Sequence, residues 1–283
     1  MSIVPSLQLN DGRQIPQFGF GTWQVPSVKV RPAIVAALDA GYRAIDTASA
    51  YNNEAAIGQA LEESAFPRYQ LYVTTKLWNT DQGFDSTLLA FESSLAKLRT
   101  SYVDLYLIHW PLPARGKYVD TWKALVRLQK EGRAKSIGVS NFHAEHLKRI
   151  IGETGVVPAV NQIELHPDFP QDELRGLHAR YGILTQSWSP LAQGGDLLKN
   201  EIVLKVAQKH KRTPAQVILR WHIDLGLIVI PKSITPARIR ENFDIWGFKL
   251  DSQDLAVLGG LDTANRLGPN PDTFDLVKRF EEE

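Results

Sequence analysis

The sequence contains no cysteine among its 283 residues. Disulfide bonds, thiolate metal sites and covalent cysteine catalysis are therefore excluded. Net charge is nearly absent as well, because 32 lysines and arginines stand against 31 aspartates and glutamates, which leaves a formal charge of +1 at pH 7. Such a balance offers no strong field to nucleic acid or to an anionic membrane surface. The composition favours small-molecule chemistry, with no nucleic-acid or membrane partner.

Long apolar runs and targeting signals are also lacking. No stretch approaches the ~18 uninterrupted apolar residues of a membrane-spanning helix. The first residues, MSIVPSLQLNDGR, lack the basic start and apolar centre of a signal peptide. With the absence of cysteine, these features predict a soluble, cytoplasmic protein.

Nucleotide-binding fingerprints and domain breaks are missing too. No G-x-G-x-x-G follows a predicted strand, since Gln24 stands where the third glycine after Gly19 and Gly21 should be, and there is no P-loop. No linker or low-complexity segment marks a second domain. Because a barrel of eight β/α units typically has ~250 residues, we expect one domain over residues 1–283.

Eight short apolar runs, which we interpret as strands, alternate with segments of helical spacing. They lie at residues 18–21, 42–45, 71–75, 103–108, 134–139, 159–164, 182–187 and 227–230. Helical spacing appears between them, for example at Leu88, Phe91, Leu95 and Leu98. Strand and helix repeated in this way indicate parallel strands joined by crossovers. The sequence therefore predicts an α/β fold, a (β/α)8 TIM barrel.

Both ends of the chain depart from this alternation. Before the first run, LQL and QIPQF flank Asn10, Asp11 and Gly12, a pattern typical of a β-hairpin. After Leu261 the segment DTANRLGPNPDTFD is rich in proline, aspartate and asparagine. We expect an N-terminal hairpin and a short irregular C-terminal tail that lies over the barrel.

Four polar side chains stand at or just past three of the predicted strands. Asp46 follows the second run, Tyr51 lies in the loop after it, and Lys76 and His109 stand at the ends of the third and fourth runs. The carboxyl ends of barrel strands meet at one mouth, so these residues are expected to face one another. Tyrosine titrates near pH ~10, but an adjacent ammonium stabilises the phenolate and lowers the pKa. The set predicts a site that delivers a proton.

Each of the four also has a structural interpretation. Asp46 could cap a turn, Tyr51 could be a half-buried aromatic, Lys76 could be a solvated strand end, and His109 could be a satisfied core histidine. The occurrence of all four at strand ends favours the functional interpretation.

Eight segments in the right order resemble the aldo-keto reductase family. They are GFGTW (19–23), GYRAIDTASAYNNE (41–54), TTKLWN (74–79), YVDLYLIHWP (102–111), SIGVSNF (136–142), VNQIELHP (160–167), SWSPLAQG (187–194) and IPKSITPARIREN (230–242). The sequences of these segments are most similar to those of small microbial members that include 2,5-diketo-D-gluconic acid reductases. The resemblance implies that Tyr51 is the general acid that protonates a substrate carbonyl, that Lys76 paired with Asp46 lowers its pKa, and that His109 orients the carbonyl.

No side chain can supply a hydride, so a cofactor is required. The resemblance implies NADPH, with NADH as a weaker alternative, and places the nicotinamide carboxamide on Ser140, Asn141 and Gln162 and its ring on Trp188. Serine and asparagine also cap helices readily, which is the structural alternative. The full set implied in cofactor binding is Thr22, Asp46, Ser140, Asn141, Gln162, Trp188, Ser189, Leu191, Lys232, Ser233, Ile234, Arg238, Glu241 and Asn242.

The segment after the eighth strand suits a phosphate. Thr235 and Pro236 resemble a helix cap followed by proline at the first helical position. A helix N-terminus beside Lys232 and Arg238 favours an anion, although a basic helix is more often simply a solvated face. The resemblance implies that Lys232, Ser233 and Arg238 hold the 2′-phosphate of NADPH, with Glu241 and Asn242 near the adenine.

Aromatic residues follow several strands and indicate a pocket for a small carbonyl compound. The resemblance suggests aldehydes and ketones, including keto-sugar acids such as 2,5-diketo-D-gluconate, or methylglyoxal. The expected substrate-binding residues are Trp23, Tyr51, Trp78, His109 and Trp110.

Two other functions remain as alternatives: a cofactor-binding regulatory subunit with little turnover, and a barrel enzyme of metal-assisted hydrolysis. The second is disfavoured because His143, Glu145 and His146 do not follow the H-E-x-x-H order. We expect no metal, and we expect a monomer.

Overall fold

The N-terminal hairpin closes one end of the molecule. The structure, a computed structural model, describes residues 4–277. The hairpin consists of β1 (Ser6–Gln8) and β2 (Gln14–Pro16), which pair antiparallel as predicted. Its side chains Leu9 and Ile15 pack against the barrel residues Leu105, Val160 and Ile228. The hairpin therefore covers the barrel end at which the strands begin.

Eight parallel strands form the barrel, and their order in the sheet follows the chain. The sheet closes on itself because the Gly19 amide donates to the Val229 carbonyl at 2.9 Å, and the Val229 amide donates to the Gln17 carbonyl at 3.0 Å. Each strand overlaps one of the eight predicted runs, which confirms the (β/α)8 fold. The strands are β3 (Phe20–Gly21), β4 (Ala44–Asp46), β5 (Tyr72–Leu77), β6 (Val103–Ile108), β7 (Ala134–Ser140), β8 (Val160–Glu164), β9 (Leu184–Trp188) and β10 (Ile228–Val229).

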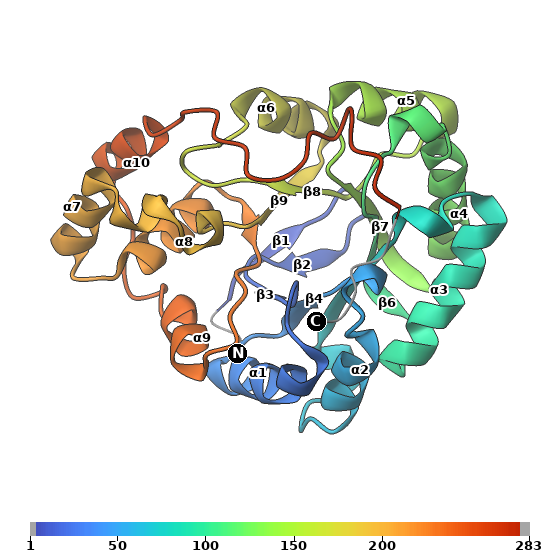
Figure 1. Ribbon diagram of the computed structural model, residues 1–283, viewed down its shortest axis with the longest axis horizontal. Coiled ribbons are helices and arrows are strands. Elements are labelled where there is room, and N and C mark those ends of the chain that lie inside the picture. Colours follow the sequence, from blue (N-terminus) through green and yellow to red (C-terminus); the bar gives the residue numbers. More distant parts are fainter. Residues whose placement is uncertain (1–3, 278–283) are drawn as a thin grey trace.

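Helices surround the strands as an outer ring (Figure 1). Their apolar faces pack on the barrel in one large buried cluster and a smaller one. None of the helices described is long and apolar enough to cross a bilayer. The helices are α1 (Ser27–Ala40), α2 (Glu54–Glu62), α3 (Phe84–Leu98), α4 (Tyr118–Lys130), α5 (Ala144–Thr154), α6 (Asp172–Tyr181), α7 (Glu201–His210), α8 (Pro214–Asp224), α9 (Pro236–Phe243) and α10 (Ser252–Gly259).

A capping motif fixes the start of α8. The Thr213 hydroxyl accepts from the Gln216 amide, and the Gln216 side chain accepts from the Thr213 amide. This reciprocal capping box satisfies two amides that the helix itself cannot bond. Pro214 occupies the first turn, where its missing N–H costs nothing.

The C-terminal segment after α10 crosses the barrel from α10 towards α4 and α5, as the red trace in Figure 1 shows. It contains no helix or strand through residue 277, as the sequence predicted. Two backbone amides, those of Leu267 and Gly268, donate to the buried Glu164 carboxylate at 2.6 and 2.9 Å. Because Glu164 is the last residue of β8, the segment is fixed over the carboxyl ends of the strands.

Candidate active site

The four strand-end residues predicted from the sequence meet at the carboxyl ends of β4, β5 and β6. Lys76 Nζ lies 2.5 Å from Asp46 Oδ1 and 3.3 Å from the Tyr51 hydroxyl. Tyr51 is the last residue of a 3-10 helix, Ser49–Tyr51, that follows β4. The rings of Tyr51 and His109 meet edge-on with centroids 5.6 Å apart. A carboxylate, an ammonium, a phenol and an imidazole thus share one site.

Lys76 is completely buried at the centre of this group. Burial disfavours its charged form, but the Asp46 carboxylate and the Tyr51 phenol outweigh burial and hold the pKa of Lys76 above its ordinary value. A third bond, from Nζ to the Thr47 carbonyl at 2.9 Å, satisfies the ammonium further. Lys76 therefore remains a cation inside the protein.

The pKa of Tyr51 differs from the sequence-based expectation, which was a net lowering by Lys76. Burial raises the pKa of Tyr51 above its ordinary value, and the Asp46 carboxylate raises it too, while the Lys76 ammonium acts in the opposite direction without overcoming burial. The reason is that protein atoms surround much of the Tyr51 hydroxyl at the edge of the cavity, which disfavours the phenolate and which sequence alone does not reveal. Tyr51 is therefore a protonated hydrogen-bond donor at neutral pH.

His109 is neutral. Burial and the nearby Lys76 ammonium lower its pKa well below its ordinary value. Its Nδ1 is buried and has no hydrogen-bond partner in the described part of the chain. A neutral imidazole carries a single N–H, so His109 acts at this site as a hydrogen-bonding group and not as a charge.

Sequence reasoning missed a buried residue that connects the loops after β3 and β4. The Asn53 amide donates to the carbonyls of Thr22 and Val25 at 2.9 and 3.2 Å, and its oxygen accepts from the Thr47 hydroxyl at 2.9 Å. Thr47 in turn supplies the carbonyl that holds Lys76. Asn53 was visible within the GYRAIDTASAYNNE segment, but nothing in the spacing indicated that its side chain turns back towards the strands.

A cavity of about 910 Å³ opens beside these residues. All fourteen residues predicted to bind a cofactor line it, as do four of the five predicted substrate-binding residues. Its lining also includes residues that sequence reasoning did not single out, from the 3-10 helix Asp196–Lys199, from the start of α8 and from the C-terminal segment. They include Leu198, Thr213, Pro214, Ala215, Leu267, Gly268, Pro269, Phe274 and Leu276.

Trp78 is the predicted substrate-binding residue that the structure does not place at the cavity. Its side chain is fully buried, and its ring packs edge-on against His109 with centroids 5.1 Å apart. A residue after a strand end can turn to either side, and in this structure the Trp78 side chain does not turn towards the cavity. Trp78 supports His109 from behind, whereas Trp23 and Trp110 line the cavity.

The polar side chains expected around the nicotinamide form one connected patch. The Ser140 hydroxyl donates to the Gln162 carbonyl at 2.8 Å, and the Gln162 amide donates to Asp46 Oδ2 at 2.7 Å. The Trp188 indole N–H donates to Asn141 Oδ1 at 2.8 Å. Ser140 and Asn141 do not cap α5, since His143 occupies the cap position. The structural alternative for this pair is therefore wrong.

Two cations also face the cavity. Lys232 and Arg238 line it, and neither has an ion-pair partner among residues 4–277. Thr235 precedes α9 and Pro236 begins it, as predicted, but the Thr235 hydroxyl makes no capping bond. Instead the Ser233 hydroxyl accepts from the Thr235 amide at 3.1 Å. A cation pair beside an uncapped helix N-terminus is suited to a phosphate.

The histidines considered for metal binding have structural partners. The His143 amide donates to His146 Nδ1 at 3.1 Å, and His143 lies 2.9 Å from the Asp272 carboxylate of the C-terminal segment. In the described ranges no group of three or more metal-ligating side chains comes together. His166 bonds to Asp168 and Glu164, so it holds the loop after β8.

A phenol, an ammonium and an imidazole beside a cavity of about 910 Å³ at the mouth of a barrel are suited to an oxidoreductase that acts on carbonyl or alcohol groups. Residues 17–262 match the model of the aldo/keto reductase family. The chain belongs to this family.

Relatives and solved structures agree with this assignment. An aldo-keto reductase of Mycolicibacterium smegmatis is 55% identical over 96% of this chain and 99% of its own length. Methylglyoxal reductase DkgA of Escherichia coli is 51% identical over 95% of this chain and 97% of its own. A mutant of Gox0644 crystallised in complex with NADPH superposes with a TM-score of 0.93, at 50% identity, over 96% of this chain and 99% of that one.

The buried ion pair makes a prediction for stability. Lys76→Met should lower the free energy of unfolding by about 3–5 kcal/mol, because it leaves the Asp46 carboxylate buried without its partner. Adding Asp46→Asn to that variant should recover most of the loss. Urea denaturation of the two variants and of Lys97→Met, a substitution of an exposed lysine, measures the effect. A second substitution that only adds to the loss would contradict the pairing.

Proposed function

We propose that the protein reduces small aldehydes and ketones to alcohols with NADPH, and that Tyr51 donates the proton. The observation that carries this proposal is the contact of the Tyr51 hydroxyl with the buried Lys76 ammonium at the edge of the 910 Å³ cavity. Reduction of a carbonyl adds a hydride to carbon and a proton to oxygen, so it requires both a donor and a hydride source.

The cavity fits NADPH at both of its polar parts. Lys232, Ser233 and Arg238 would hold the 2′-phosphate, since the two cations lack carboxylate partners in the described chain. Burial lowers the pKa of Lys232, and a phosphate would restore the balance of charge there. Glu241 and Asn242 would lie near the adenine, with Ile234 beside them.

At the other end, Ser140, Asn141 and Gln162 would bind the nicotinamide carboxamide, and Trp188 would stack on the ring. Thr22 and Asp46 would face the adjoining ribose, and the lining residues Ser189 and Leu191 would complete this part of the site. When bound, the cofactor supplies the hydride that no side chain can supply.

The chain's own residues supply the proton and the orientation. Tyr51, kept protonated by burial, donates its hydroxyl proton to the carbonyl oxygen as negative charge develops there. The Lys76 ammonium stabilises the phenolate that remains, and Asp46 and the Thr47 carbonyl hold Lys76 in place. Neutral His109 fixes the carbonyl direction without adding a charge.

Two relatives and the cavity walls support a small carbonyl substrate. Trp23 and Trp110 line the cavity, and the Trp110 ring packs on Phe274 with centroids 4.3 Å apart. Related proteins from Escherichia coli and Yersinia pestis are named methylglyoxal reductase. The substrates we propose are therefore methylglyoxal and keto-sugar acids such as 2,5-diketo-D-gluconate. NADH would serve as a weaker alternative to NADPH.

We also propose that the protein is a single domain over residues 1–283 that works as a cytoplasmic monomer. The reaction consumes NADPH, which is a metabolite of the cell interior.

Tyr51→Phe tests the proton donor. Loss of general acid catalysis should reduce kcat for methylglyoxal reduction by about 100-fold or more, while NADPH still quenches the protein fluorescence on binding. The assay follows the loss of reduced-nicotinamide absorbance, and Tyr181→Phe, which alters an exposed tyrosine on α6, is the matched control. Normal turnover by Tyr51→Phe would refute the assignment.

Arg238→Ala and Lys232→Ala test the cofactor preference. Each should weaken NADPH binding by about tenfold or more, because a charge-assisted bond to the 2′-phosphate is lost, and should leave NADH binding nearly unchanged. Arg240→Ala removes an exposed arginine from the same helix and should affect neither. Titration with both nucleotides measures the difference, and equal weakening of the two would argue against phosphate contacts.

The pKa shifts predict the pH dependence of the chemical step. The lowered pKa of His109 keeps it neutral well below pH 6.5, and the raised pKa of Tyr51 keeps it protonated beyond pH 10. The rate of hydride transfer should therefore stay level from about pH 6 to about pH 9.5 and fall only above that range. Single-turnover rates with deuterated NADPH isolate this step. An acid limb near pH 6.5 would show that His109 titrates normally.

A further inference from the structure

Asn53 stands at the N-cap position of α2, where an asparagine side chain ordinarily bonds to a backbone amide of the helix that follows. Here the side chain makes no capping bond. It is buried, with 1% exposure, and both of its N–H groups and its oxygen bond to residues outside the helix. The side chain therefore serves the loops around the candidate active site and not the helix that it precedes.

The amide nitrogen of Asn53 fixes a turn in the wall of the active-site cavity. It donates to the carbonyls at the two ends of this turn, those of Thr22 and Val25, at 2.9 and 3.2 Å. The Val25 amide closes the turn by donating to the Thr22 carbonyl at 3.1 Å. Trp23 lies between them and lines the cavity, as does Thr22 itself. The position of this part of the wall therefore depends on Asn53.

The oxygen of Asn53 closes the loop that carries Tyr51. It accepts from the Thr47 hydroxyl at 2.9 Å, so the chain is joined across the 3-10 helix that ends at Tyr51. The Ser49 hydroxyl ties the same loop to β5 by donating to the Lys76 carbonyl at 3.0 Å. Because the Thr47 carbonyl accepts from Lys76 Nζ, a bond that anchors the Thr47 side chain also limits the movement of this partner of the buried ammonium.

We propose that Asn53 is a positioning residue for the reduction: it holds the Tyr51–Lys76 pair in a fixed relation to the cavity wall that carries Thr22 and Trp23. Proton delivery needs such precision, since a displacement of about 1 Å can cost about 100-fold in rate. Asn53 does not itself line the cavity that the described residues form, so it acts through the two loops. The inference rests on the proposed function, in which Tyr51 is the proton donor.

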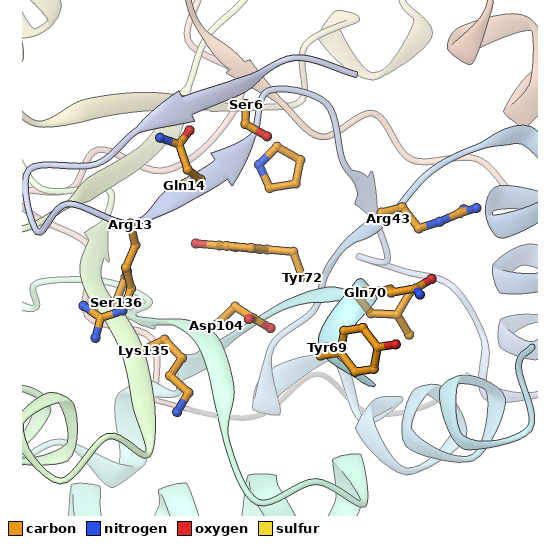
Figure 2. Close-up of a pocket in the computed structure, with 12 residues that line it drawn as sticks. Ser6, Arg13, Gln14, Arg43, Tyr69, Gln70, Tyr72, Asp104, Lys135 and Ser136 are labelled. Carbon is orange, nitrogen blue, oxygen red and sulfur yellow. The ribbon is translucent and has the colours of Figure 1, made fainter. Parts of the chain in front are cut away.

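Gln17 offers a matched control, because it is a buried amide that makes the same kind of bonds at the other end of the barrel. Its side chain donates to the carbonyls of Ile223 and Leu227 at 3.0 and 3.1 Å. Gln17 directly follows β2 of the hairpin. Figure 2 shows this end of the molecule, where Tyr72, the first residue of β5, lies beneath the hairpin. A general effect of losing a buried amide should therefore appear equally in Gln17→Ala.

Kinetics of Asn53→Ala test the positioning role. The variant should lower kcat for methylglyoxal reduction by about tenfold or more. The solvent isotope effect on its single-turnover rate should rise, because proton transfer from a misaligned Tyr51 becomes the slower event. Gln17→Ala should change neither quantity. An unchanged kcat or isotope effect in Asn53→Ala, or an equal loss of kcat in Gln17→Ala, would overturn the proposal.

Substitutions of Thr47 test the same bond from its other side, and they do so even where Asn53→Ala folds poorly. Thr47→Val removes the hydroxyl that donates to Asn53 and should lower kcat by about threefold or more, the rate equivalent of one modest hydrogen bond. Thr47→Ser keeps a hydroxyl and should retain the parent rate. An equal loss in Thr47→Ser and Thr47→Val would show that the bond to Asn53 is not the cause and would count against the proposal.

Unfolding measurements separate this inference from the proposed function, since they need no turnover. If Asn53 supports the surroundings of Lys76, Asn53→Ala and Lys76→Met together should destabilise the protein by less than the sum of their separate losses. Gln17→Ala and Lys76→Met, at independent sites, should add. Urea denaturation of the single and paired variants measures both sums. A parent protein that does not reduce methylglyoxal would refute the proposed function, whereas additive losses for Asn53 and Lys76 would refute the positioning role.

Discussion

The rest of the site depends on one buried charge, the ammonium of Lys76. A fully buried cation is tolerated only when its charge and its three protons are all satisfied. Here Asp46, the Thr47 carbonyl and the Tyr51 hydroxyl surround it. Because these partners come from β4 and from the loop after it, while Lys76 comes from β5, the barrel must hold adjacent strands in fixed register for the charge to be stable. The fold and the chemistry thus impose the same geometry.

The same charge separates the roles of its neighbours. Burial favours the neutral forms of Tyr51 and His109. The Lys76 ammonium also favours the neutral imidazole of His109, whereas at Tyr51 it favours the phenolate and so opposes burial. One ring therefore keeps a transferable proton and the other keeps an uncharged hydrogen-bonding edge. Asp46 extends the hydrogen-bond network across the barrel. Its second oxygen accepts from the Gln162 amide, which also donates to the Gln186 side-chain oxygen at 2.9 Å. The proposed cofactor patch and the proton donor belong to one continuous network.

Much of this arrangement could be predicted from the sequence, and the failures have physical reasons. Apolar runs and strand-end polar residues locate Asp46, Lys76 and His109, because the carboxyl ends of barrel strands must converge. The burial of Trp78 behind His109 could not be foreseen, because side-chain direction beyond a strand end depends on packing. The net pKa shift of Tyr51 was missed because desolvation is a tertiary property. The role of Asn53 was missed because its hydrogen-bond partners Thr22 and Val25 lie in a different loop.

Strand β5 links the hairpin end of the barrel to the candidate active site. Tyr72 and Lys76 lie four residues apart on the same face, so about 13 Å of extended backbone separates them. Between the two ends the barrel interior is packed with buried side chains such as Leu105, Leu107 and Val160, against which the hairpin residues Leu9 and Ile15 also pack. Because a close-packed interior has few voids and low compressibility, the hairpin at the far end helps to hold β5 where Lys76 meets Asp46 and Tyr51.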